Sequence, residues 1–159
     1  MNTIPRKQVV TILVADDDQE DRMLIREALE ENRFASDLRF VEDGEELMNY
    51  LHRKGIYEDP AKSPRPGIIL LDLNMPRKDG RESLKEIKSD PGMREIPIVV
   101  LTTSGAQEDV LRTYDLGVNS FITKPVTFEA LVEVVRTLGR YWFEIVELPT
   151  HPEKALRGK

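Results

Sequence analysis

The stretch IILLDLNMPRKDG, residues 68–80, places four apolar residues directly before an aspartate and a polar turn that contains proline and glycine. A short apolar run bounded in this way is typical of a strand that is buried on both faces of a parallel sheet. The run ends at Asp72, and in open α/β sheets ligands bind just beyond the carboxyl ends of the strands. We therefore predict that residues 68–71 form the central strand and that Asp72 lies in a functional crevice.

Two further apolar runs also end in charged residues. Residues 12–15 (ILVA) lead into the acidic triplet 16–18, and residues 121–123 (FIT) lead into Lys-Pro at 124–125. If these runs are strands of the same parallel sheet, their carboxyl ends meet at one edge. The sequence thus predicts several carboxylates and one ammonium group around a crevice that suits a divalent cation and a phosphoryl group.

Strand-like and helix-like segments alternate along the chain. We predict strands at residues 10–15, 37–41, 68–71, 96–101 and 120–123, and helices at about 19–31, 43–52, 81–90, 107–116 and 128–143. This alternation predicts the α/β class, with a doubly wound five-stranded parallel sheet and helices on both of its faces. The flavodoxin-like strand order 2-1-3-4-5 sets the first and third strands side by side. The charged loop 53–66 is predicted to be a surface insertion without a chemical role.

Composition narrows the function further. The chain has 159 residues, enough for one domain, and its net charge of −6 disfavours non-specific binding to nucleic acid or to an anionic membrane. The absence of cysteine excludes disulfides and thiolate metal sites. The sequence shows no signal peptide and no apolar run long enough to span a membrane, so we expect a cytoplasmic protein.

The residue types at the predicted crevice point to phosphoryl chemistry on an aspartate. Three neighbouring carboxylates, Asp16, Asp17 and Asp72, repel one another unless a cation is present, and Mg²⁺ prefers such hard oxygen ligands. Asp72 is the best placed nucleophile, because a carboxylate can attack a phosphoryl donor. Lys124 can neutralise the added charge, and the hydroxyl of Thr102 can donate to a phosphoryl oxygen. An acidic triplet taken alone is equally typical of a solvated loop.

In combination, these motifs resemble the receiver domain of two-component response regulators. The resemblance covers roughly residues 8–140 and rests on TILVADDDQED, IILLDLNMPRKDG, IPIVVLTTSG and VNSFITKP. It implies that Asp72 accepts a phosphoryl group from a phosphohistidine of a sensor kinase. It also implies that Asp16, Asp17, Asp72 and the backbone carbonyl of Asn74 hold Mg²⁺.

The resemblance assigns further roles. Thr102 and Lys124 would contact the phosphoryl oxygens, and Thr102 would act as a switch together with the aromatic residue of the fifth strand. That aromatic residue is Phe121, which lacks the hydroxyl of a tyrosine. Asp18 is left as a residue of the first helical turn. From the residues alone, Pro125 is a candidate for a cis peptide bond, as occurs in tight functional turns.

The residues after the predicted receiver domain form a C-terminal extension, 141–159, which is apolar to about residue 149 and then polar and loose. We expect no DNA-binding output domain, because only 21 residues follow Leu138. The last helix carries more apolar residues than packing on a sheet requires. Either the tail packs back on its own domain, or the protein forms a homodimer through the fourth helix, fifth strand and fifth helix. The predicted dimer interface comprises Leu131, Val135, Leu138, Tyr141 and Trp142.

The tail, the loop 53–66 and the stretch TYDLGVNSFITKPV most resemble the small regulators that partner bacterial phytochromes. This resemblance implies a bacteriophytochrome as the sensor histidine kinase. We expect a signalling module that acts by protein–protein contact and is not an enzyme with a separate substrate. Two alternatives remain: a phosphatase with a D-x-D motif at 16–18, and a receiver-like binding module that is never phosphorylated. The first lacks the expected threonine after the motif, and the second usually lacks an acidic or lysine position that is present here.

Overall fold

The computed structural model describes residues 10–31, 36–142 and 147–149. Within them, strands and helices alternate: β1 Val10–Ala15, α1 Gln19–Glu31, β2 Ser36–Val41, α2 Gly44–His52, β3 Ile68–Leu71, α3 Gly80–Ser89, β4 Ile98–Thr102, α4 Gln107–Leu116, β5 Ser120–Thr123 and α5 Phe128–Arg140. All neighbouring strands pair in parallel, and their order is β2-β1-β3-β4-β5. The predicted fold class and strand order are therefore confirmed.

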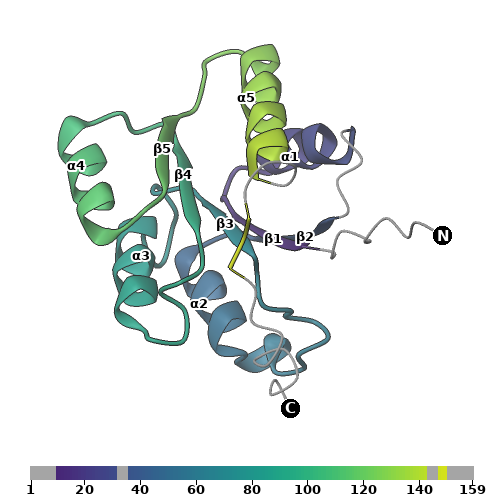
Figure 1. Cartoon of the computed structure of the whole chain (residues 1–159), viewed down its shortest axis with the longest axis vertical. Helices are drawn as coiled ribbons and strands as arrows, with labels where there is room; N and C mark the ends of the chain where they lie inside the picture. The colour runs from purple at the N-terminus through teal and green to yellow at the C-terminus, as the bar shows by residue number, and fades with distance from the viewer. Residues whose placement is uncertain (1–9, 32–35, 143–146, 150–159) are drawn as a thin grey trace.

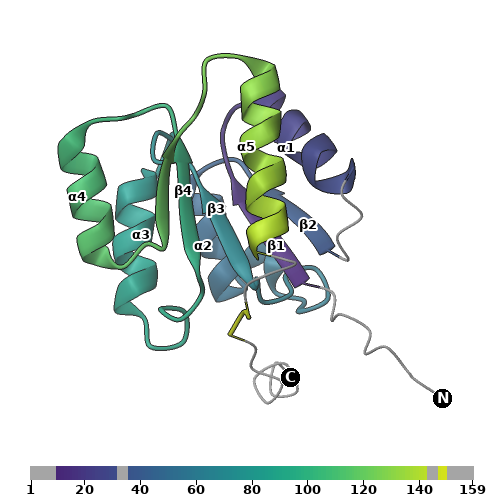
Figure 2. The ribbon, with the colours of Figure 1, turned by 45° about the horizontal axis from the view of Figure 1, so that its top comes forward.

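Helices cover both faces of the sheet (Figures 1 and 2). Helices α1 and α5 pack on one face, whereas α2 and α3 pack on the other and α4 lies next to α3 beyond the β5 edge. The strand sequences explain this arrangement, because successive side chains point to opposite faces. In β1, Leu13 and Ala15 belong to the α2/α3 core, and Ile12 and Val14 belong to the α1/α5 core.

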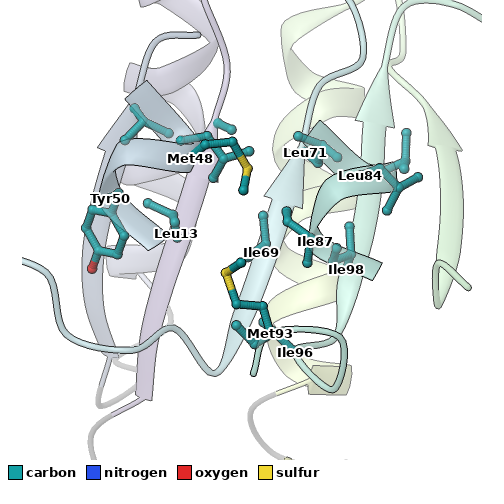
Figure 3. Close-up of a cluster of buried hydrophobic side chains, with 14 of the residues drawn as sticks. Leu13, Met48, Tyr50, Ile69, Leu71, Leu84, Ile87, Met93, Ile96 and Ile98 are labelled. Atoms are coloured by element: carbon teal, nitrogen blue, oxygen red, sulfur yellow. The ribbon is translucent and has the colours of Figure 1, made fainter. Parts of the chain in front are cut away.

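Figure 3 shows the core between the sheet and helices α2 and α3. Leu13, Ile69 and Ile98 project from three neighbouring strands toward Met48 of α2 and Ile87 of α3. Asp43 and Asp79 lie directly before these two helices, and the side chain of each accepts a hydrogen bond from a first-turn N–H. The helices thus begin where the sequence supplies a cap, and their apolar faces close this core.

The second core is closed by α5, and it corrects part of the predicted dimer interface. Leu131, Val135 and Trp142 are buried among residues of β1, β3, β4 and α1, and Trp142 is only 7% exposed. Because these three side chains already pack inside the domain, they are not available to a second copy. Of the other predicted interface residues, Leu138 is half-buried and Tyr141 is exposed.

The segment after α5 is described in part. Leu148 packs against the same α5 core, close to Gly67 before β3, which is the behaviour expected of a tail that folds back on its domain. The rest of the predicted extension, at residues 143–146 and 150–159, lies outside the described residues. Among the helices that the structure describes, none combines the length and hydrophobicity needed to cross a bilayer.

The start of strand β4 and the structure of the loop 53–66 both differ from the sequence prediction. Strand β4 begins at Ile98 and not at residue 96, since Pro97 has no N–H and the N–H of Ile96 donates to the carbonyl of Met93. The loop 53–66 contains a 3₁₀ turn at Gly55–Tyr57 and is tied to α2, because the hydroxyl of Tyr50 donates to the carbonyl of Pro64 at 2.7 Å.

Candidate functional site

Backbone hydrogen bonds to neighbouring strands position three of the predicted site residues. Each lies immediately after a strand, and its N–H donates to a carbonyl of a neighbouring strand: Asp16 to Val41 at 3.1 Å, Asp72 to Ala15 at 2.9 Å and Lys124 to Thr102 at 2.7 Å. These bonds continue the parallel ladders by one residue beyond the strands. The carboxyl ends of β1, β3, β4 and β5 therefore meet at one crevice, as the sequence predicted.

Asp72 lies at the centre of this crevice and is only 5% exposed. Its Oδ1 accepts hydrogen bonds from the Thr102 hydroxyl at 2.8 Å and from the Asn74 N–H at 3.2 Å. Its Oδ2 lies 3.3 Å from the Lys124 ammonium. Both oxygens of the buried carboxylate thus face groups that can also bind phosphoryl oxygens. The predicted role of the Asn74 backbone carbonyl remains a prediction.

The Lys124 ammonium contacts three carboxylates. Its Nζ lies 2.7 Å from Asp16, 2.8 Å from Asp21 and 3.3 Å from Asp72. Burial alone would lower the pKa of Lys124, but the hydrogen bonds with Asp16 and Asp21 outweigh it, so the pKa is raised and the ammonium stays charged. Burial raises the pKa of Asp16 to about 6, an effect that the bond with Lys124 reduces.

The carboxylates fit a divalent cation. One oxygen from each of Asp16, Asp17 and Asp72 lies within 4.8 Å of the others. Asp16 and Asp72 are buried whereas Asp17 is exposed, so the cluster opens to solvent on one side. Hard carboxylate oxygens with one open side suit an ion that keeps several water ligands, as Mg²⁺ does. The predicted metal ligands are thus brought together.

Asp18, the third member of the acidic triplet, is not part of this cluster. Its side chain is exposed and accepts hydrogen bonds from the N–H groups of Glu20 and Asp21, where it caps α1. The D-x-D pair of the phosphatase alternative is therefore split between a buried crevice residue and an exposed helix cap. This geometry does not favour the phosphatase.

Two predictions on the fifth strand and the turn after it have different outcomes. Phe121 is half-buried against the α2/α3 core, and its N–H donates to the hydroxyl of Tyr114 of α4 at 3.1 Å, while its role as a switch stays a prediction. The Lys124–Pro125 peptide bond is trans, so the cis prediction was wrong. Most X–Pro bonds are trans, and Lys124 contacts Asp16 with the bond in this form.

The sequence reasoning missed two groups near the crevice. Asp21 of α1 was not among the predicted site residues, yet its carboxylate contacts Lys124. Arg81 of α3 forms a bidentate pair with Asp109 of α4 at 2.7 and 2.6 Å, and it also contacts Asp79 and, at 3.4 Å, the side chain of Asn74. A possible signal for Arg81 was its position in the first turn of α3, directly beyond the Asp79-Gly80 turn.

Comparison with known proteins agrees with this geometry. The sequence profile of the family described as "Response regulator receiver domain" matches residues 12–136, which is most of the chain. The chain belongs to the response regulator receiver family. The predicted membership of this family is thus confirmed. The crevice around Asp72 lies at the carboxyl ends of the strands of this receiver domain.

The proteins that this chain resembles include phytochrome response regulators. Response regulator Rcp1 of Synechocystis sp. is 43% identical over 138 residues, which cover 87% of this chain and 92% of Rcp1. The crystal structure of the Mn²⁺-bound form of Rcp1 matches with a TM-score of 0.84 and covers 89% of this chain and 99% of that one.

Two further solved structures extend this likeness. The phosphorylated cyanobacterial phytochrome response regulator RcpA is 42% identical with a TM-score of 0.85, and covers 90% of this receiver and 100% of RcpA. The bacteriophytochrome response regulator RtBRR is 36% identical with a TM-score of 0.70, and covers 94% of this chain and 90% of RtBRR. The receiver is therefore similar to phytochrome response regulators in both sequence and fold.

Proposed function

We propose that this receiver accepts a phosphoryl group from a sensor histidine kinase onto Asp72 in a Mg²⁺-dependent reaction and signals by contact with other proteins. The observation that carries the proposal is the burial of Asp72 between Thr102 at one carboxylate oxygen and Lys124 at the other. A carboxylate in such a position can act as a nucleophile whose product charge is already matched by fixed donors.

The transfer step forms one bond to phosphorus and breaks another. A carboxylate oxygen of Asp72 attacks the phosphorus of the phosphohistidine, the bond between phosphorus and the imidazole nitrogen breaks, and an acyl phosphate forms. Lys124 supplies a permanent positive charge at this point, because its pKa is raised above the usual value. Thr102 supplies a hydroxyl donor that can turn from the carboxylate to a phosphoryl oxygen.

Asp16, Asp17 and Asp72, with the backbone carbonyl of Asn74, would hold the Mg²⁺ ion. When bound, the ion would neutralise negative charge on the carboxylates and the incoming phosphoryl group. The similar protein Rcp1 crystallised in a Mn²⁺-bound form, which supports a divalent ion for this receiver as well.

The test is phosphorylation by acetyl phosphate, followed by intact-protein mass spectrometry. The wild type should gain one phosphoryl group with Mg²⁺ and none with a chelator. Asp72→Asn should gain none, whereas Asp18→Asn should be labelled like the wild type because Asp18 lies outside the cluster. Labelling of Asp72→Asn at the wild-type level would overturn the proposal. We also propose that there is no separate substrate, so small phosphate monoesters should not be turned over.

A phytochrome-type kinase is the proposed donor. The similar proteins RcpA and RtBRR support it, since they are a phytochrome and a bacteriophytochrome response regulator, respectively. Two exposed apolar side chains follow crevice residues in the sequence and could contact a partner protein. Met23 lies two residues after Asp21, and Val126 lies two residues after Lys124. Phosphotransfer from radiolabelled candidate kinases tests this proposal, and rapid transfer from an unrelated kinase alone would contradict it.

We propose a homodimer that uses the exposed surface of α4, β5 and α5. The large apolar side chains that remain exposed there include Leu111 and Tyr114 of α4 and Tyr141 after α5. Exposed apolar groups of this size favour a protein contact. Light scattering of the unphosphorylated protein should give the mass of two chains, and a monomer at every concentration would remove this proposal.

A further inference from the structure

The Lys124 ammonium is closer to two other carboxylates than to the proposed phosphoacceptor. Asp16 and Asp21 lie 2.7 and 2.8 Å from its Nζ, whereas Asp72 lies 3.3 Å away. Asp21 comes from the first turn of α1, and its side chain is 17% exposed. It is not part of the carboxylate cluster that can hold a metal ion. Asp21 therefore contacts the ammonium without being one of the proposed metal ligands.

The proposed function creates competition for the other two partners of Lys124. A divalent ion held by Asp16 and Asp72 would share these two carboxylates with the ammonium, and its charge would repel the ammonium. Phosphorylation would further convert one Asp72 carboxylate oxygen into the bridging oxygen of an acyl phosphate, which removes the carboxylate charge. Asp21 is the partner of Lys124 that neither event removes.

We propose that Asp21 is a positioning residue that retains the Lys124 ammonium at the crevice while the metal ion and the phosphoryl group take over Asp16 and Asp72. This inference rests on the proposed function. Without Asp21, the ammonium has only the two carboxylates that the metal needs, so it competes more strongly for them. Loss of Asp21 should therefore weaken metal binding beyond the effect of removing one negative charge.

The test measures Mg²⁺ affinity by calorimetry, with no phosphorylation involved. Asp21→Asn should lower the affinity about tenfold, as expected for the loss of one charge-assisted hydrogen bond. The matched control is Asp18→Asn, which removes a charge from the same acidic stretch and keeps a good helix cap, and should cost only about twofold. Asp21→Glu, which restores a carboxylate, should recover most of the affinity. Circular dichroism should confirm that each variant is folded.

A double-mutant cycle identifies Lys124 as the link. In a Lys124→Met background, Asp21→Asn should cost no more than Asp18→Asn, because there is no ammonium to retain. Equal effects of Asp21→Asn and Asp18→Asn in the wild-type background, or an undiminished effect of Asp21→Asn in the Lys124→Met background, would overturn the inference. A wild type that binds no Mg²⁺ would instead refute the proposed function.

Discussion

Helix α4 precedes β5 in the chain and α5 follows it, yet the two helices are attached to the domain in different ways. Helix α5 buries Leu131 and Val135, and Trp142 just beyond its end is buried as well. In α4 the one buried residue is Thr113, whose hydroxyl donates to a carbonyl of the same helix. The start of α4 is held instead by polar contacts, in which Asp109 accepts from Arg81 and from Ser104.

The two helices therefore differ in what attaches them to the domain: apolar burial for α5 and mainly polar contacts for α4. Apolar burial under α5 attaches this helix to α1 and to the sheet. Polar contacts at the start of α4 can be exchanged without exposing a core. Ser104, which bonds Asp109 at 2.8 Å, lies only two residues beyond Thr102. A short loop thus connects Thr102 at the crevice to the start of α4.

The largest expected effect is on the α5 side. Trp142→Ala should lower the free energy of unfolding by about 3–5 kcal/mol, because it leaves a cavity in the α5 core. Leu111→Ala in α4 should change it by less than about 0.5 kcal/mol, since that side chain is 63% exposed. Denaturant unfolding followed by circular dichroism measures both values. Similar losses for the two variants would contradict the proposed difference between the helices.

A smaller effect should appear in α4 alone. Asp109→Asn removes the carboxylate that pairs with Arg81, so the amides of α4 should exchange with solvent about tenfold faster while those of α5 stay unchanged. Asp115→Asn, an exposed residue of the same helix, is the matched control and should leave exchange in α4 unaltered. Faster exchange throughout the domain would show that the pair supports the whole fold and not α4 specifically.

The same pair predicts a dependence on pH. The hydrogen bond with Arg81 lowers the pKa of Asp109 to about 2. Because this folded-state pKa lies below the usual value of about 3.9, the pair is at full strength above that value and weakens as the pH falls from about 4 to 2. Titration of the Asp109 carboxyl carbon by NMR measures the pKa directly. A midpoint at the usual value would mean that the pair does not form in solution.

The smallest effect concerns the second polar contact between α4 and β5. Tyr114→Phe removes the hydroxyl that accepts the N–H of Phe121, and should lower the free energy of unfolding by about 0.5–1.5 kcal/mol. Removal of the whole ring in Tyr114→Leu serves as the comparison. If Tyr114→Phe has no effect and Tyr114→Leu does, the ring and not the hydroxyl connects the two elements.

Much of the fold could be predicted from the sequence because the apolar runs of β1, β3 and β5 lead directly into charged residues. That pattern located Asp16, Asp72 and Lys124 at one edge of a parallel sheet, and the structure brings them together. The contacts of Asp21 and Arg81 could not be predicted in this way, since they join side chains from helices and loops far apart in sequence.

The predicted dimer interface shows a second limit. An amphipathic pattern reveals that Val135 and Trp142 are apolar, but it does not show which apolar surface covers them. The structure places both in the core of the same domain. The trans bond at Pro125 could not be decided either, because the two isomers of an X–Pro bond differ little in energy.

The most direct test of the central claim locates the phosphoryl group itself. After incubation with acetyl phosphate and Mg²⁺, borohydride reduces an aspartyl phosphate to homoserine, which peptide mass mapping identifies. We predict conversion at Asp72 and at no other aspartate, with none in Asp72→Asn. Conversion at Asp16 or Asp17, or an unmodified Asp72 in a protein that has gained a phosphoryl group, would contradict the assignment of Asp72 as the acceptor.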